Sequence, residues 1–199
     1  ATVIPYFNRF IKHIPNLETL AKYDDQKLIK LWEGLGYYSR VKNLKKTAQI
    51  VIKDFNKNLP NNFLDLKSLP GIGDYTASAI MAIAFNKPII PLDGNIERVL
   101  KRYLYLKNEN QIQKDNLVKQ KKIFGTSLRA SDYAQALMEL GALICKPINP
   151  YCEQCPISEK CKSYKKKDFV LNKLKKINKE KYYLLNVYKK EKKYLLIKN

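Results

Sequence analysis

The stretch LPGIGDYTASAI, from Leu69 to Ile80, places Gly71 and Gly73 directly before a run of helix-forming residues. Glycine carries no Cβ, so the chain can turn tightly there and another backbone can come close. Such a turn brings backbone N–H groups and a helix N-terminus to one point, which is a favourable place for a phosphate. The same pattern also fits a plain helix–turn–helix with a glycine cap, so both interpretations stay open on these residues alone.

Apolar residues on either side of this stretch recur at helical spacing through most of the first 145 positions. The periodicity predicts helices over residues 3–14, 28–35, 41–55, 63–69, 77–84, 96–104 and 133–144. The connections between them are short, as is usual between packed helices. We therefore expect an all-α core, with Trp32 inside it and with the only histidine, His13, in a structural role.

The chain changes character after Cys161. A lysine-rich segment leads to YYLLNVY (182–188) and KYLLIK (193–198), two β-rich runs joined by a polar turn. These runs predict a β-hairpin that opens a second domain. The chain starts at Ala1 without a methionine and stops just after an apolar run. We therefore expect a fragment that lacks sequence at both ends.

The net charge of +20 arises from 38 Lys and Arg against 18 acidic residues. A field of this sign attracts polyanions and points first to nucleic acid. However, 33 of the 38 are lysines, and residues 162–199 carry +11 against +9 for residues 1–161. The skew is equally typical of a composition bias. No apolar run approaches the ~18 residues of a membrane span, so we expect a soluble, cytoplasmic, nucleoid-associated protein without membrane contact.

All the cysteines lie within CKPINPYCEQCPISEKC, at spacings that leave six, two and five residues between them: Cys145, Cys152, Cys155 and Cys161. Disulfides are disfavoured, because nothing indicates export. Structural zinc usually uses two close pairs separated by a longer loop, whereas only one close pair is present here. Four thiolates on one loop favour an iron–sulfur cluster. On spacing alone, zinc stays an alternative.

Five blocks of the sequence together resemble one protein family. They are GLGYYSRVKNL (34–44), LPGIGDYTASAI (69–80), LDGNIERVL (92–100), YAQALMELGALIC (133–145) and the cysteine loop. Their order and spacing resemble the endonuclease III and MutY branch of the helix-hairpin-helix DNA glycosylases, over roughly residues 1–165. The resemblance implies a helix-hairpin-helix fold, a [4Fe–4S] cluster on the four cysteines, and DNA phosphate bound at Gly71 and Gly73.

Asp93 stands directly before a predicted helix, where an aspartate commonly acts as the N-cap. A carboxylate can also stabilise the positive charge that develops on deoxyribose when an N-glycosidic bond breaks. The resemblance makes Asp93 the catalytic aspartate. Gly94 and Asn95 match the Asp-Gly-Asn of adenine glycosylases, in which the asparagine helps to hold the carboxylates by hydrogen bonding.

Tyr75 occupies the position where strand-cutting members of the family carry a lysine. An amine can form a Schiff base with the sugar and a phenol cannot, so the sequence predicts a monofunctional enzyme. Tyr75 is otherwise a packing aromatic at a helix start. By the same resemblance, Tyr37 is a wedge inserted beside the lesion, and Gln135 lies near the adenine pocket; both also fit ordinary surface or core positions.

The predicted function is base excision repair of double-stranded DNA by a monomer that removes adenine mispaired with 8-oxoguanine or guanine. The family's general acid is a glutamate upstream of the segment that resembles residues 1–7, so we expect the 199-residue chain alone to be nearly inactive. Alternatives are a bifunctional endonuclease III-type enzyme, a thymine-mismatch glycosylase, and a non-catalytic iron–sulfur DNA-binding protein.

Three domains are expected. Residues 1–88 carry the helix-hairpin-helix, and residues 89–165 carry Asp93 and the cluster. Residues 166–199 form a basic linker and the start of a domain that resembles the Nudix-like domain of the family.

Overall fold

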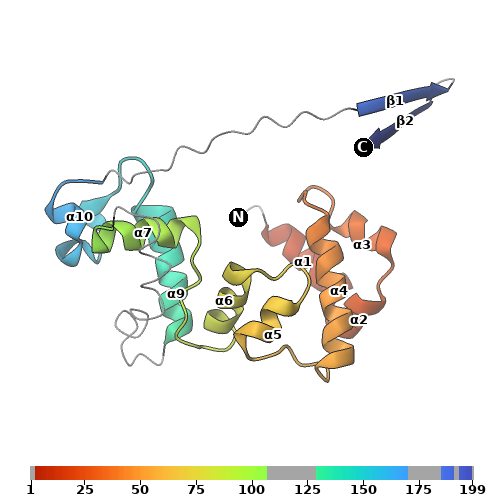
Figure 1. Cartoon of the computed structure of the whole chain (residues 1–199), viewed down its shortest axis with the longest axis horizontal. Helices are drawn as coiled ribbons and strands as arrows, with labels where there is room; N and C mark the ends of the chain where they lie inside the picture. Colours follow the sequence, from red (N-terminus) through yellow and green to blue (C-terminus); the bar gives the residue numbers. More distant parts are fainter. Residues whose placement is uncertain (1–2, 107–128, 170–184, 191–192, 199) are drawn as a thin grey trace.

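The computed structural model describes residues 3–106, 129–169, 185–190 and 193–198. These residues form a helical body and one β-hairpin (Figure 1). The α-helices are α1 (Ile4–His13), α2 (Leu17–Lys22), α3 (Asp25–Leu31), α4 (Ser39–Asp54), α5 (Phe63–Ser68), α6 (Asp74–Ile83), α7 (Gly94–Leu104), α9 (Ala130–Glu139) and α10 (Lys162–Lys165). A π-helical turn, η1 (Leu140–Ile144), extends α9, and the cysteine loop contains the 3₁₀ turns η2 (Cys152–Gln154) and η3 (Ser158–Lys160).

The predicted all-α core is confirmed, with three differences in detail. The helix predicted over residues 28–35 instead runs from Asp25 to Leu31, because the Asp24 side chain caps it by accepting a hydrogen bond from the Lys27 amide. Helix α2 was not expected, because six residues are too short to show a helical period; it begins where the Asn16 side chain accepts a hydrogen bond from the Thr19 amide at 2.8 Å. The last predicted helix changes from α to π geometry at Leu140, so its final turn is wider than the periodicity indicated.

Buried apolar side chains gather in three groups. One joins the end of α1 to α2, α3 and α4, and comprises Ile14, Leu20, Leu28, Val41 and Ala48. The second joins α4, α5 and α6, and comprises Val51, Leu66, Leu69, Ala77 and Met81. The third joins α7, α9 and η1, and comprises Ile90, Ile96, Val99, Leu100, Ala130, Leu137 and Leu140. Two faces of α4 therefore serve two cores, and α6 packs against α9 beside the third. The boundaries of the three predicted domains stay a prediction.

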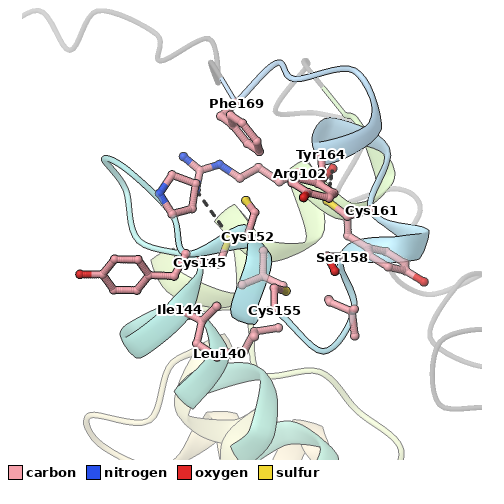
Figure 2. Close-up of a pocket in the computed structure, with 15 residues that line it drawn as sticks. Arg102, Leu140, Ile144, Cys145, Cys152, Cys155, Ser158, Cys161, Tyr164 and Phe169 are labelled. Carbon is pink, nitrogen blue, oxygen red and sulfur yellow. Dashed lines mark hydrogen bonds between the residues drawn. The ribbon is translucent and has the colours of Figure 1, made fainter.

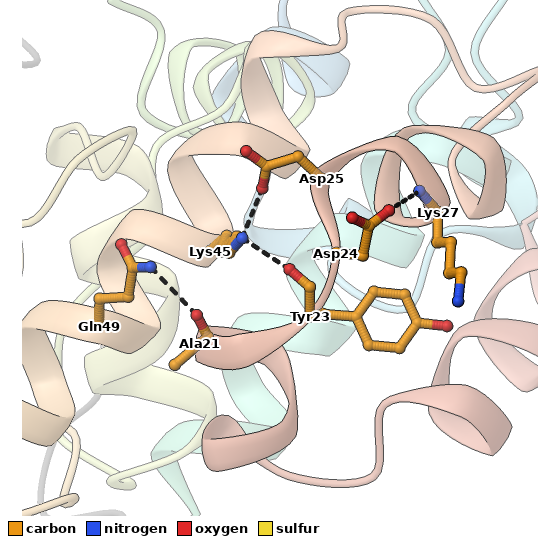
Figure 3. Close-up of polar contacts among 7 residues, drawn as sticks. All are labelled: Ala21, Tyr23, Asp24, Asp25, Lys27, Lys45 and Gln49. Carbon is orange, nitrogen blue, oxygen red and sulfur yellow. Dashed lines mark hydrogen bonds and ion pairs between the residues drawn. The ribbon is translucent and has the colours of Figure 1, made fainter.

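Polar contacts fasten the α2–α3 connection onto α4 (Figure 3). The Lys45 ammonium donates to the Tyr23 carbonyl at 2.6 Å and pairs with the Asp25 carboxylate, which lowers the pKa of Asp25. One turn further along α4, the Gln49 amide donates to the Ala21 carbonyl at 3.0 Å. Two side chains of one helix thus satisfy the free carbonyls at the end of α2, which fixes where α3 starts.

The apolar stripe of α1 is only partly used. Phe10 meets Trp32 edge to face, with ring centroids 6.1 Å apart, which confirms Trp32 as a core contact. The remaining large apolar side chains of this segment, Val3, Ile4, Phe7 and Ile11, are exposed. His13 uses its Nδ1 in a hydrogen bond with the Arg9 carbonyl at 2.9 Å, which agrees with a structural role.

The predicted hairpin is confirmed at the level of the backbone. Strands β1 (Leu185–Lys190) and β2 (Lys193–Lys198) pair antiparallel, from Leu185 opposite Lys198 to Lys190 opposite Lys193. Within the part of the chain that the structure describes, no helix is both long enough and apolar enough to cross a membrane.

Candidate functional site

The turn between α5 and α6 needs glycine at Gly71. Its φ of +79° lies in the left-handed region, and a Cβ added there would come within 2.9 Å of the Asn43 Cβ on α4. The Thr47 hydroxyl donates to the Pro70 carbonyl at 3.0 Å and holds the turn against the same helix. The turn is therefore pressed onto α4, and its conformation is set before any ligand arrives.

Gly73 has a different reason to be glycine. Its backbone is extended, with φ at −94°, a conformation open to any residue, so the tight turn predicted for both glycines requires it only at Gly71. Gly73 is the N-cap residue of α6 and has no side chain that could accept hydrogen bonds from the first amides of the helix. A Cβ added at Gly73 would meet no atom within 4 Å. Residues 73–75 are exposed and no side chain caps the first amides of α6, so these amides are available to a group from outside.

Asp93 caps α7. One carboxylate oxygen, Oδ1, accepts hydrogen bonds from the amides of Asn95 at 3.0 Å and Ile96 at 2.7 Å. The capping interpretation is confirmed, yet it occupies only that oxygen. Among the described residues, no hydrogen-bond donor reaches Oδ2.

The Asp93 carboxylate lies close enough to interact with the helical hairpin, which is formed by α5, the glycine turn at residues 69–74 and α6. The pKa of the Tyr75 phenol is raised, first by burial of the ring and second by the negative charge of Asp93. Tyr75 belongs to the first turn of α6 and is 44% exposed. The fold therefore brings the acid at the start of α7 to the mouth of the hairpin at the start of α6.

Asn95 is tied to the cysteine loop through Arg98. The Arg98 guanidinium donates to the Asn95 Oδ1 at 2.9 Å, to the Gly141 carbonyl at 2.6 Å and to the Cys145 carbonyl at 2.8 Å. A Cβ added at Gly141 would stand 2.8 Å from the Asn95 Cβ, so η1 can approach α7 only because residue 141 is glycine. The Asn95 side chain thus supports the Asp93 turn from the side of the cysteine loop and makes no hydrogen bond to the carboxylate itself within the described residues.

The four cysteines line one pocket between α7, η1 and the loop that follows (Figure 2). Apolar side chains make up most of its remaining wall, among them Val99, Leu140, Ile144, Ile157 and Phe169. The pKa of Cys152 is raised by burial and by the neighbouring thiols, and that of Cys155 is raised mainly by burial. Four thiolates so placed repel one another unless a cation lies between them.

No group of three or more Cys, His, Asp or Glu in the described ranges is arranged around a single metal ion. The four thiols that line the pocket are ligands of the kind that both zinc ions and iron–sulfur clusters use.

Arg102 closes one side of this pocket. Its side chain is buried, and Nη1 and Nη2 donate to the carbonyls of Lys146 at 2.7 Å and Pro147 at 2.8 Å. Nη1 also lies 3.5 Å from the Cys145 sulfur. The Nε–H is buried and has no partner among the described residues. Arg102 is one of the residues that line the pocket, and it thus keeps one donor for which the described residues supply no acceptor.

Tyr37 projects from the turn between α3 and α4, with 79% of its surface exposed. Its φ of +47° is unusual for a residue with a side chain. The Arg40 guanidinium lies 5.2 Å from its ring and 5.9 Å from the ring of Trp32, whose Nε1 donates to the Gly36 carbonyl at 3.0 Å. Tyr37 is thus an exposed aromatic on a braced turn, as a wedge must be.

Gln135 lies on the exposed side of α9, where its amide donates to the Ser131 hydroxyl at 3.2 Å. Nothing described ties it to Asp93 or Tyr75, so its place near a base pocket stays a prediction.

Three important residues were not singled out from the sequence: Arg98, Arg102 and Gly141. For Arg98 and Arg102 the sequence contains a pattern that could have indicated their importance. Only five arginines occur in a chain with 33 lysines, and two of the five stand one helical turn apart directly after Asp93. A planar guanidinium can serve several acceptors at once, which a lysine cannot. Gly141 shows nothing in the sequence that reveals its contact with Asn95.

Comparison with known proteins gives the family. Residues 1–121 match the family described as HhH-GPD superfamily base excision DNA repair protein, over more than half of the chain. The chain belongs to this superfamily. The resemblance inferred from the five sequence blocks is therefore confirmed.

Relatives in this superfamily agree with the resemblance. The adenine DNA glycosylase of Buchnera aphidicola subsp. Baizongia pistaciae is 43% identical over 163 residues, which are 82% of this chain and 46% of that protein. The adenine DNA glycosylase of Homo sapiens is 37% identical over 82% of this chain and 30% of its own length. The chain spans about half the length of the bacterial relative.

The fold is also that of solved superfamily structures. A thermostable thymine-DNA glycosylase superposes with a TM-score of 0.71 at 29% identity, over 82% of this chain and 76% of that one. An endonuclease III in a non-covalent DNA complex superposes with a TM-score of 0.68 at 23% identity, over 83% and 77%, and shows the shared fold alone.

Proposed function

We propose that the protein removes adenine mispaired with 8-oxoguanine or guanine from double-stranded DNA by hydrolysis of the N-glycosidic bond. One observation carries the proposal. Asp93 caps α7 with one oxygen, leaves the other without a donor among the described residues, and acts electrostatically on Tyr75 at the mouth of the hairpin. A carboxylate held in this way can stabilise positive charge on a sugar that the hairpin positions.

In this proposal the hairpin, Tyr37 and Asp93 have separate roles. The exposed amides at Gly73 and the start of α6 take a DNA phosphate, which gives register without reading sequence. Tyr37 enters the duplex and helps the target nucleotide to leave the stack, since a base inside a duplex is out of reach. Asp93 then faces the deoxyribose, where its charge stabilises the oxocarbenium-like state as adenine departs.

Tyr75 limits the reaction to base removal. The charge of the same carboxylate reaches its phenol and helps to raise the pKa of that phenol, and a phenol forms no Schiff base with the sugar C1′. The product is therefore an abasic site in an intact strand, and the bifunctional alternative is disfavoured.

A [4Fe–4S] cluster fits the cysteine pocket. Cys145, Cys152, Cys155 and Cys161 line it and would be the ligands, its remaining wall is mostly apolar, and the Arg102 guanidinium adds a positive charge at the Cys145 sulfur. When bound, the cluster would offset part of the negative charge of the thiolates and would cross-link the loop into one rigid unit. Arg98 donates hydrogen bonds to both the Cys145 carbonyl and the Asn95 side chain, and Gly141 packs against Asn95. A rigid cysteine loop would therefore also hold the turn that contains Asp93.

The relatives' names favour adenine, whereas the structural similarity to a thymine-DNA glycosylase keeps thymine opposite guanine as a second candidate. The Asp-Gly-Asn sequence at residues 93–95 supports adenine.

Binding to a charged sugar mimic tests the role of Asp93 without requiring turnover. Three duplexes carry adenosine, a neutral tetrahydrofuran abasic analogue or a cationic azaribose opposite 8-oxoguanine. We expect the chain to bind the cationic duplex at least about tenfold more tightly than the neutral one. Asp93→Asn should keep the neutral affinity and lose the preference, because asparagine caps a helix as well as aspartate does. Equal binding of both duplexes by the parent chain would falsify the assignment.

Two further duplexes separate the alternatives. Tighter binding to thymine opposite guanine than to adenine opposite 8-oxoguanine indicates the thymine enzyme. A covalent adduct with an abasic duplex after borohydride treatment indicates the bifunctional one, and we expect none.

A further inference from the structure

Arg102 is among the most buried charged residues that the structure describes, with 4% of its surface exposed. A buried guanidinium is costly unless its charge and its donors are matched. Among the described residues no carboxylate pairs with it, in contrast to its neighbour Lys101, whose ammonium pairs with Glu97 at 2.6 Å. Arg102 therefore needs another source of negative charge.

The thiols supply that charge. Arg102 points across the pocket toward Cys145, and its Nη1 lies 3.5 Å from that sulfur (Figure 2). On the opposite side its main-chain carbonyl lies 3.6 Å from the Cys161 sulfur, which acts as donor there in its thiol form. One residue thus touches the first and the last cysteine of the loop.

The surroundings keep water away from this contact. The Phe169 ring lies 5.8 Å from the guanidinium carbon on its outer side, and Tyr105 anchors the same segment by donating to the Asp168 carboxylate at 2.7 Å. Charge interactions are strengthened where water is excluded, so a cation here acts more strongly on the sulfurs than a surface lysine does.

We propose that Arg102 is a positioning residue for the cluster that also raises its reduction potential. The inference rests on the proposed [4Fe–4S] cofactor. Two donors hold the loop after Cys145 through the carbonyls of Lys146 and Pro147. The positive charge lies 3.5 Å from the Cys145 sulfur through Nη1, where it favours the form of the cluster that carries one more electron, and the Nε–H is left as a further donor without a partner among the described residues.

Arg98 shows why this role belongs to Arg102. Both arginines lie on α7 one turn apart, and both contact the residues that follow η1. Arg98 donates to the Cys145 carbonyl, whereas Arg102 reaches the Cys145 sulfur. Both therefore hold the loop, but only Arg102 adds charge and donors at the sulfurs.

The test reconstitutes the full chain with iron and sulfide and measures the midpoint potential on an electrode, which supplies the electron. We expect Arg102→Met to lower the potential and to speed the loss of iron to a chelator. Arg102→Lys keeps the charge but removes the Nε–H, so we expect a smaller fall. Lys101→Met removes a buried charge from the same helix without a sulfur contact, and we expect it to leave the potential unchanged.

Each outcome decides something. If Arg102→Met takes up no cluster, the potential of Arg102→Lys decides, and a value equal to that of the parent overturns the proposal. A parent chain that loads its cluster while both variants keep its potential overturns the role of Arg102 alone. A parent chain that takes up no iron and sulfide overturns the cofactor assignment, and this inference with it.

Discussion

The hairpin at residues 69–74 and the cysteine loop at residues 145–161 meet negative groups in opposite ways. The hairpin offers uncapped main-chain amides at an exposed turn, where a Cβ added at Gly73 would meet no other atom. The cysteine loop lines a pocket with its thiols, and the donor at that pocket is one buried arginine side chain. The first suits a ligand that comes and goes, and the second suits a group that stays.

The difference also concerns what holds each loop. Glycine geometry and one hydroxyl fix the hairpin against α4, so its conformation depends on residues that carry little side chain. The cysteine loop and the π turn before it are held to α7 by two arginines, which between them donate to four main-chain carbonyls outside that helix. Substitutions in the two loops should therefore fail for different reasons.

The largest effect is expected at Arg98. Arg98→Met leaves the carbonyls of Gly141 and Cys145 and the Asn95 side chain without their donor, at a cost of about 3 kcal/mol in the free energy of unfolding. Chemical denaturation of the chain measures this. Arg129→Met is the matched control, because that arginine is exposed and pairs with Asp132; we expect a change within about 0.5 kcal/mol. Equal costs for both would show that the cysteine loop does not depend on its arginine anchor.

A pair of hairpin variants separates folding from binding. Gly71→Ala forces a side chain into a left-handed conformation and against Asn43, and should cost about 2 kcal/mol of stability. Gly73→Ala meets open space and should cost about 0.5 kcal/mol. Its Cβ, however, stands where a phosphate would approach, so duplex affinity should fall about fivefold through loss of roughly one hydrogen bond. Unchanged affinity in Gly73→Ala would rule out the amides at this turn as the phosphate site.

The outer side of the cysteine loop carries lysines that are at least partly exposed and, we predict, face DNA: Lys146, Lys160 and Lys162. Replacing all three by glutamine should lower the slope of log affinity against log salt by about 0.9 for each phosphate that is no longer neutralised. Titrations of duplex binding between low and moderate salt measure the slope. The control replaces Lys12, Lys22 and Lys53, on α1, α2 and α4, by glutamine. An equal change in both triple variants would show a general charge effect rather than a local one.

The smallest effect concerns Tyr75 at high pH. Because the pKa of its phenol is raised in the folded state, its contribution to stability is present below the ordinary tyrosine pKa of about 10 and is lost as the pH rises through the folded value. Tyr75→Phe should therefore show a shallower alkaline fall in stability than the parent chain. Asp93→Asn removes the second cause of the shift and should lie between them. Three superimposable curves would show that the phenol and the carboxylate do not interact.

Local patterns predicted much of the fold. The stripes of α4 and α7 are long enough to show their period, and the cap at Asp93 begins a helix where expected. Helix α2 escaped prediction because it has only six residues, and the π turn of η1 did so because periodicity does not distinguish it from an α turn. In α1 the helix was predicted correctly, but most of its apolar side chains are exposed. An amphipathic pattern predicts a helix with an apolar face and does not identify what that face packs against.

The sequence by itself determined the helices, the glycine turn and the gathering of thiols on one loop, because each depends on neighbours along the chain. Only the tertiary structure decided that Asp93 acts on Tyr75, that η1 meets Asn95 at Gly141 and that Arg102 faces Cys145. These contacts join segments 18 to 46 residues apart, and no local pattern encodes them. They follow from the way α6, α7 and α9 bury their apolar faces together, which sets the direction of every polar side chain between them.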